Sequence, residues 1–213
     1  MKVRKPTGEA GWPNLLVEGK EGAGKTYACL RLSADPRVGQ TYVIEVGERR
    51  ADEYAALGNF LIVEHDGTAR GVVDAIYEVM AQPPADGRPN VMVIDSLSGL
   101  WDLVKREAEN IARSSKAAQQ ILAQDPHAVI DVKHQAWNKA KDPYWWGWLN
   151  RLRAWPGIAL LTGRADEVSK FVDGRPVAGQ TEYRVEIENG TPFILDGTVR
   201  MRLGKPPLVT TAK

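Results

Sequence analysis

The glycine-rich stretch at residues 19–26 has the residue types and spacing best suited to chemistry. Glycines in such a loop allow a tight turn whose backbone N–H groups converge on an anion. Lys25 adds positive charge, and the Thr26 hydroxyl occupies the position that ligates Mg²⁺ beside a triphosphate. The stretch therefore predicts a site for ATP with Mg²⁺. Its residues are Gly19, Lys20, Glu21, Gly22, Ala23, Gly24, Lys25 and Thr26.

The residues on either side of this loop support the same interpretation. An apolar run at residues 15–17 precedes it and is typical of a buried strand. A helix-like stretch at residues 25–33 follows and is closed by Asp35-Pro36. The alternative, a chance glycine-rich turn, explains neither flank.

Asp95 is the candidate for a second Mg²⁺ ligand. It follows the apolar residues 91–94, which predict a buried strand ending at the carboxyl edge of the sheet. Enzymes with this kind of loop hold Mg²⁺ with such an acid, directly or through water. We expect Ser96 to hydrogen-bond in the same network. The alternative is that Asp95 or Ser96 simply caps a helix.

An acid beside the γ-phosphate is needed to polarise the attacking water. Glu48 lies just beyond Gly47, at the mouth of a β-branched strand predicted over residues 41–46, whereas Glu45 lies within that strand. Glu48 is the better placed of the two, and Glu45 remains an alternative. The non-catalytic interpretation makes residues 48–50 an exposed charged turn.

Arg164 is a candidate sensor of the γ-phosphate. It follows an apolar strand predicted over residues 158–162 and would lie at the same edge of the sheet. A guanidinium group matches phosphate oxygens in geometry and charge. The alternative is an ordinary surface arginine.

Strands and helices alternate along most of the chain, which predicts an α/β fold with a mostly parallel central sheet flanked by helices. Further strands are expected near the C-terminus, giving a β-rich end. We expect one domain over residues 1–213. The expected strands are 15–18, 41–46, 60–63, 91–95, 158–162, 182–188, 192–195, 199–203 and 208–211, and the expected helices are 25–33, 51–57, 72–80, 99–123 and 145–155.

Composition narrows the class of protein. The 213 residues are 43% hydrophobic and 26% charged, with a net charge of +1, so any nucleic-acid site must be local. Cys29 is the one cysteine, which excludes an internal disulfide. No apolar run reaches the roughly 18 residues that span a bilayer, so no membrane association is expected. A single cysteine fits a reducing cytoplasm, which is the expected location. Residues 1–13 form a basic arm, and the strand-like end suggests a longer native chain.

Together these residues resemble the RecA-like recombination ATPases, and most closely the phage-encoded AAA/RecA-like ATPases linked to single-strand annealing. The resemblance implies a RecA-like P-loop ATPase fold, ATP hydrolysis stimulated by single-stranded DNA, and assembly into a ring or filament of identical subunits. It also implies a role in phage DNA recombination in the host cytoplasm. The matching residues are 19–26, 42–48, 52–54, 93–98, 162–164, 167–168, 183–186 and 198–201.

Glu48 and Asp52 match the spacing of acids in this family, which favours Glu48 over Glu45. Val46 departs from the pattern, because the family usually has an aspartate there. Residues 105–155 do not match the family's DNA-binding loops. DNA binding therefore rests on the resemblance alone.

Two basic stretches are candidates for contacting single-stranded DNA, which favours basic grooves interleaved with aromatic residues. The first is residues 133–141, followed by the aromatic residues 144–148; the alternative is that these tryptophans pack a helix onto the sheet. The second is the N-terminal arm, with Lys2, Arg4 and Lys5. His65 has no second ligand at metal-binding spacing and is interpreted as structural or superficial.

Two other functions are compatible with the loop. A P-loop kinase for a small metabolite usually needs an arginine-rich lid, for which Arg106 and Arg113 are too scattered. A nucleotide-dependent interaction module that does not hydrolyse ATP would need no catalytic Glu48.

Overall fold

Eight strands form the centre of the computed structural model, which describes residues 1, 3, 5, 11–84, 86–172 and 174–212. Seven of them run in the order β3-β2-β4-β5-β1-β7-β8, and β6 pairs with β5 outside this path. The strands are β1 Asn14–Gly19, β2 Thr41–Glu45, β3 Phe60–Ile62, β4 Val91–Asp95, β5 Ile158–Val172, β6 Arg175–Val185, β7 Gly197–Arg202 and β8 Lys205–Ala212.

Strand β5 lies between the two strands that carry the predicted site. It pairs in parallel with β1, which leads into the glycine-rich loop, and with β4, which ends at Asp95. Parallel pairing also joins β2 to β3 and β4, and β1 to β7, whereas β8 returns antiparallel to β7. The expected mostly parallel sheet, flanked by helices and followed by antiparallel strands near the C-terminus, is confirmed.

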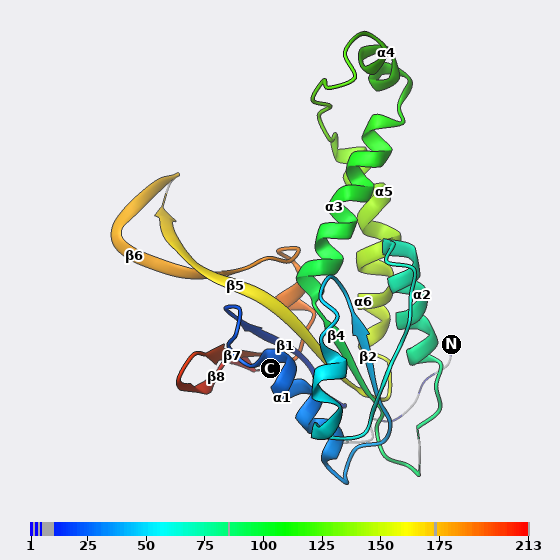
Figure 1. Ribbon diagram of the computed structural model, residues 1–213, viewed down its shortest axis with the longest axis vertical. Helices are drawn as coiled ribbons and strands as arrows, with labels where there is room; N and C mark the ends of the chain where they lie inside the picture. Colours follow the sequence, from blue (N-terminus) through cyan, green and yellow to red (C-terminus); the bar gives the residue numbers. More distant parts are fainter. Residues whose placement is uncertain (2, 4, 6–10, 85, 173, 213) are drawn as a thin grey trace.

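Helices lie on both faces of this sheet (Figure 1). Three of the helices are capped at their N-terminus by a side-chain hydroxyl. The hydroxyl oxygens of Thr68, Ser96 and Ser115 accept hydrogen bonds from the N–H groups of Gly71, Gly99 and Ala118, respectively. The helices are α1 Lys25–Arg31, α2 Ala69–Met80, α3 Leu97–Arg113, α4 Lys116–Gln124, α5 His134–Lys141 and α6 Gly147–Leu152, with short helical turns η1 Leu32–Ala34, η2 Ala51–Leu57, η3 Asp142–Trp146 and η4 Thr191–Phe193.

Side chains of the central strands point alternately to the two faces of the sheet and contribute to two separate hydrophobic cores. One contains Leu16, Ile44, Met92 and Ile94 and packs against α2, α3 and α6, while the opposite core packs against α1 and η2. The second core includes Val17, Val43, Val91, Val93, Cys29 and Leu30. Because both faces are covered, these strands read as nearly continuous apolar runs in the sequence.

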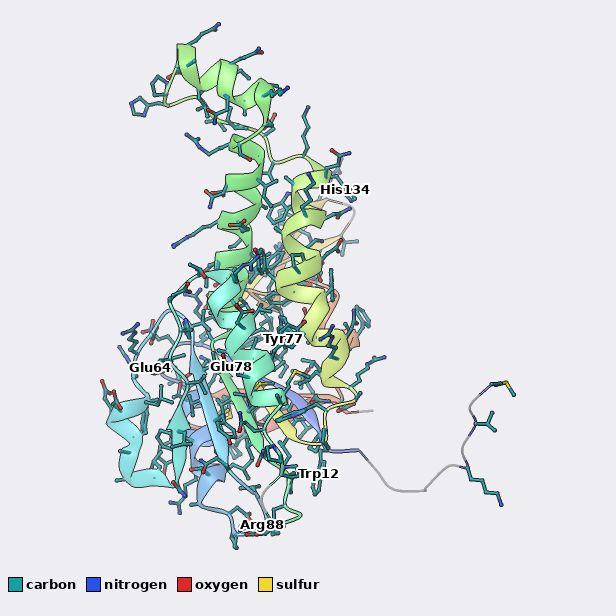
Figure 2. The ribbon with its side chains drawn as sticks, turned by 90° about the vertical axis from the view of Figure 1, so that its right-hand side faces the viewer. Trp12, Glu64, Tyr77, Glu78, Arg88 and His134 are labelled. Carbon is teal, nitrogen blue, oxygen red and sulfur yellow. The ribbon has the colours of Figure 1, made fainter. Side chains whose placement is uncertain are left out.

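Two elements extend from the carboxyl edge of the sheet (Figure 1). The first is a helical projection made of α3, α4 and α5. Helix α3 starts two residues after Asp95 and packs against α5, and α4 lies at the far end. Trp101 on α3 stacks on Trp137 of α5, with ring centroids 6.0 Å apart. Figure 2 shows His134 at the start of α5 on the projection and Arg88 at the opposite end of the molecule. The second element is the hairpin of β5 and β6, which leaves the sheet after Arg164.

The structure corrects four expected elements. The helix expected over residues 99–123 ends at Arg113, and Ser115 caps a separate α4. The helix expected over residues 145–155 is instead η3 and α6, preceded by α5. Residues 192–195, expected as a strand, overlap the helical turn η4, where Pro192 favours a turn start. Strand β5 runs to Val172, well beyond its apolar part, because β6 pairs with its exposed half.

No helix in the described part of the chain combines the length and apolar character that a membrane span requires. Of the basic N-terminal arm, Lys2 and Arg4 lie outside the described residues.

Candidate nucleotide-binding site

The glycine-rich loop joins the end of β1 to the start of α1, at the carboxyl edge of the sheet. Gly22 and Gly24 have φ angles of 72° and 84°, in the left-handed region that residues with a Cβ rarely adopt. Alternating conformations of this kind turn successive backbone N–H groups toward one side, which makes an anion-binding nest. These φ angles are compatible with a phosphate-binding loop.

The Lys25 ammonium group closes the base of this loop. Its Nζ donates to the carbonyl oxygens of Gly19 and Lys20, both at 2.9 Å. Burial lowers the pKa of Lys25, and the nearby carboxylates of Asp95 and Glu48 oppose that shift. The loop therefore presents a partly buried cation beside two carboxylates.

Thr26 and Asp95 meet across the intervening strand β5. The Thr26 Oγ1 donates to Asp95 Oδ2 at 2.6 Å. Mg²⁺ takes oxygen ligands and usually keeps waters and substrate phosphates, so it needs only one or two protein groups. This donor set fits Mg²⁺ bound with a triphosphate, in which Thr26 and Asp95 would hold the ion. Among the described residues, no three His, Cys, Asp or Glu side chains gather into a metal site of another kind.

The two candidate catalytic acids have different surroundings. The Glu45 carboxylate accepts the N–H groups of Arg50 and Ala51 at 2.6 and 2.7 Å, so it fixes the start of η2. The Glu48 side chain is 63% exposed, with one ion pair to Arg50 at 3.5 Å. Glu48 also acts electrostatically on Lys25. Glu45 therefore shapes the loop that leads into η2, and the role of Glu48 as the acid beside a phosphate stays a prediction.

Arg164 lies beside the loop but is held by acids. It is in register with Gly19, its Nη2 pairs with Asp102 at 2.7 Å, and its Nε lies 3.4 Å from Glu186. Its positive charge contributes to the lowered pKa of Lys25. Contact with a γ-phosphate therefore requires the guanidinium to exchange these carboxylates for phosphate oxygens, and the sensor role stays a prediction.

A buried ion pair behind the loop was missed from the sequence. Glu18, directly before Gly19, pairs with Arg200 of β7 at 2.5 Å, and the Arg200 guanidinium lies 4.1 Å from the ring centroid of Tyr183 on β6. A charged residue at the end of an apolar strand is the only local signal of this pair. Its partner is 182 residues away, which local patterns do not identify.

Replacing Arg200 with alanine is expected to lower the free energy of unfolding by about 3 kcal/mol, because the Glu18 charge is left buried without its partner. The Glu18 side chain is 4% exposed and that of Arg200 is 24% exposed. Urea unfolding followed by circular dichroism measures the change. Arg202→Ala is the control, since the Arg202 side chain donates to the Pro206 carbonyl at the surface. An equal decrease in the free energy of unfolding in the two variants would show that the ion pair does not contribute more to stability than a surface contact.

The aromatic residues of the first DNA-binding candidate are mostly part of the core. Trp145 and Trp148 are wholly buried, and the Trp145 Nε1 donates to Thr191 Oγ1 at 3.0 Å. The packing alternative is therefore correct for these two tryptophans, and they do not form a stacking surface for bases.

His65 is structural: its Nε2 lies 2.8 Å from the Glu45 carbonyl oxygen.

Comparison with known proteins supports the fold. No family model and no curated protein matches the chain. The structure is similar to the ATPase EscN of the enteropathogenic E. coli type III secretion system, solved as an assembled ATPase with its central stalk EscO. That match has 14% identity and a TM-score of 0.51, and it covers 91% of this chain and 43% of that one.

Two further solved structures are similar. The RadB recombinase shares 14% identity at a TM-score of 0.47, with 97% of this chain and 84% of that chain covered. A prototypical ATPase from the type III secretion system of pathogenic bacteria shares 12% identity at a TM-score of 0.42, with 90% and 51% covered. The chain thus spans less than half the length of EscN. The chain therefore has a RecA-like α/β fold with a mostly parallel central sheet.

Proposed function

We propose that this protein is a Mg²⁺-dependent ATPase that binds ATP in the loop at residues 19–26 and hydrolyses it. The observation that carries the proposal is the hydrogen bond from Thr26 to Asp95, which joins the loop to the acid of β4 across β5. This contact lies beside a partly buried lysine in a loop already shaped for anions. Each of these features matches a requirement of phosphoryl transfer.

The residues divide the work between binding and reaction. The loop N–H groups and Lys25 would hold the phosphates, and Thr26 and Asp95 would hold the cation, which would supply positive charge beside the phosphate oxygens. Glu48 orients the attacking water and accepts its proton. Arg164 leaves Asp102 and Glu186 to stabilise charge on the γ-phosphoryl group as it passes from ADP, the leaving group, to the attacking water.

We further propose that ATP turnover serves phage DNA recombination by single-strand annealing, in a homo-oligomer acting in the host cytoplasm. The support is the resemblance of the loop, the acid strand and residues 162–164 to that family. The helical projection and the β5–β6 hairpin add exposed elements that start beside the nucleotide site. Lys133 and Lys139 remain exposed on the projection and are the best placed of the expected DNA contacts.

Phosphate release by the purified chain tests this function. We expect turnover that requires Mg²⁺ and rises several-fold with single-stranded DNA, the stimulation weakening as salt is raised. No stimulation and no shift of a labelled oligonucleotide would refute the DNA role alone. Mg²⁺-dependent ATP binding without turnover would refute hydrolysis and favour a nucleotide-dependent interaction module. Phosphoryl transfer to a nucleoside would favour a kinase.

A further inference from the structure

The Asp95 carboxylate is held from both sides by threonine hydroxyls. Thr26 donates to its Oδ2, and Thr162 of β5 donates to its Oδ1. Thr162 is wholly buried, so bulk water does not reach its hydroxyl. Thr162 lies on β5, where it is in register with Val17 of the neighbouring strand β1. Strand β4 pairs with β5 on the other side. A rigid strand therefore supplies the second contact.

Counting protons shows what the second contact does. A threonine hydroxyl has one proton to donate. The Thr162 Oγ1 lies 2.5 Å from Asp95 Oδ1 and 3.4 Å from the Ile94 carbonyl oxygen, so the carboxylate is the acceptor that the geometry favours. The Thr26 hydroxyl likewise donates its one proton in a hydrogen bond to Asp95. The lone pairs of Thr26 Oγ1 therefore remain available to bind a cation.

We propose that Thr162 is a positioning residue for the Mg²⁺ site. Its hydroxyl holds the Asp95 carboxylate in the orientation in which Oδ2 accepts the hydrogen bond from Thr26. The Thr26 oxygen then faces the cation that accompanies the triphosphate. Without the Thr162 hydroxyl, the carboxylate is free to rotate, and the Thr26 oxygen loses its fixed direction. This inference rests on the proposed function, because it assigns a supporting residue to the same site.

Titration with Mg²⁺ separates this role from a purely structural one. The probe is a fluorescent ATP analogue bound to the full chain, with anisotropy followed as Mg²⁺ is added. Thr162→Val keeps the shape of the side chain and removes the hydroxyl. We expect the Mg²⁺ concentration for half-maximal binding to rise about 10-fold, the lower end of the effect of losing a residue that orients a metal ligand. Binding of the analogue in EDTA should stay as in the wild type.

Two comparisons make the test specific. Thr162→Ser and Thr162→Ala differ only by the hydroxyl, so the serine variant should keep the wild-type Mg²⁺ requirement and the alanine variant should show the shift. This pair also serves if the valine variant does not fold. Thr41→Val is the matched control: Thr41 is buried in β2 of the same sheet, and its hydroxyl has no partner within the described residues.

The outcomes distinguish the positioning role of Thr162 from the proposed nucleotide-binding function on which it rests. If the wild type shows Mg²⁺-dependent binding and Thr162→Ala or Thr162→Val has the same Mg²⁺ requirement, the positioning role is overturned while the nucleotide site stands. If Thr41→Val shifts the requirement equally, the effect is general to the sheet and the positioning role is again overturned. If the wild type binds no analogue with Mg²⁺, the proposed function itself fails.

Discussion

Replacing Lys25 with alanine is expected to abolish measurable ATP turnover and to weaken triphosphate binding about 100-fold. The ammonium group is the cation that the loop directs at the β- and γ-phosphates. Loss of one such preorganised donor typically lowers kcat by a factor of about 10²–10³, and a hydrogen bond to a charged group is worth about 1.5–3 kcal/mol, roughly 10- to 150-fold in binding. The same group ties the base of the loop together through the Gly19 and Lys20 carbonyls. Its loss therefore removes charge and also loosens the backbone that forms the anion nest. A binding titration with ATP and a phosphate-release assay measure the two effects.

Lys20→Ala is the matched control for this variant. Lys20 lies in the same loop and is exposed, and it contributes its backbone carbonyl to the contact with Lys25. Removing its side chain should leave ATP binding within about two-fold of the wild type, as expected of a surface charge. If Lys20→Ala impairs binding as much as Lys25→Ala, the specific role of Lys25 is wrong and a general loss of positive charge explains the result.

Glu48→Gln is expected to lower kcat by a factor of about 10²–10⁴ with little change in ATP binding. Glutamine keeps the size of the side chain but does not accept the proton of the attacking water, and general-base catalysis is typically worth this factor. The side chain is well exposed, so the variant should fold as the wild type does. Single-turnover phosphate release, compared with an equilibrium binding curve, separates chemistry from binding.

Glu45→Gln tests the competing assignment. The Glu45 carboxylate oxygen accepts the N–H groups of Arg50 and Ala51, and a glutamine carbonyl oxygen can accept the same bonds. We therefore expect near-normal turnover in this variant. Loss of turnover in Glu45→Gln with normal turnover in Glu48→Gln would reverse the assignment. Normal turnover in both would place the catalytic acid elsewhere.

Short sequence patterns predict the loop and the acid strand of the candidate site, and the structure places Thr26 within hydrogen-bonding distance of Asp95. The loop at residues 19–26 carries its own signature, and Asp95 stands out because four apolar residues precede it. Their hydrogen bond also follows from the sheet, since parallel strands bring their carboxyl ends to one edge. The choice between Glu45 and Glu48 was less certain, because both acids lie at the end of β2. In the structure, they differ in that Glu45 accepts two backbone N–H groups at the start of η2, whereas Glu48 is exposed.

Contacts between distant segments were beyond the sequence patterns. The Glu18 and Arg200 pair and the Thr162 and Asp95 pair join residues 182 and 67 positions apart. The β5–β6 hairpin was also missed over much of its length, because most of its side chains are exposed on both faces and show no apolar alternation. Tryptophans 145 and 148 suited both a stacking surface and a core, and burial decided between these.

A structure of the chain with Mg²⁺ and a non-hydrolysable ATP analogue tests the central claim most directly. The account predicts the β- and γ-phosphates inside the loop at residues 19–26, with Lys25 Nζ turned from the loop carbonyls to the phosphates. It also predicts Mg²⁺ at about 2.1 Å from Thr26 Oγ1, with Asp95 beside it. An analogue bound elsewhere on the molecule, or phosphates in the loop with no cation near Thr26 and Asp95, would contradict it.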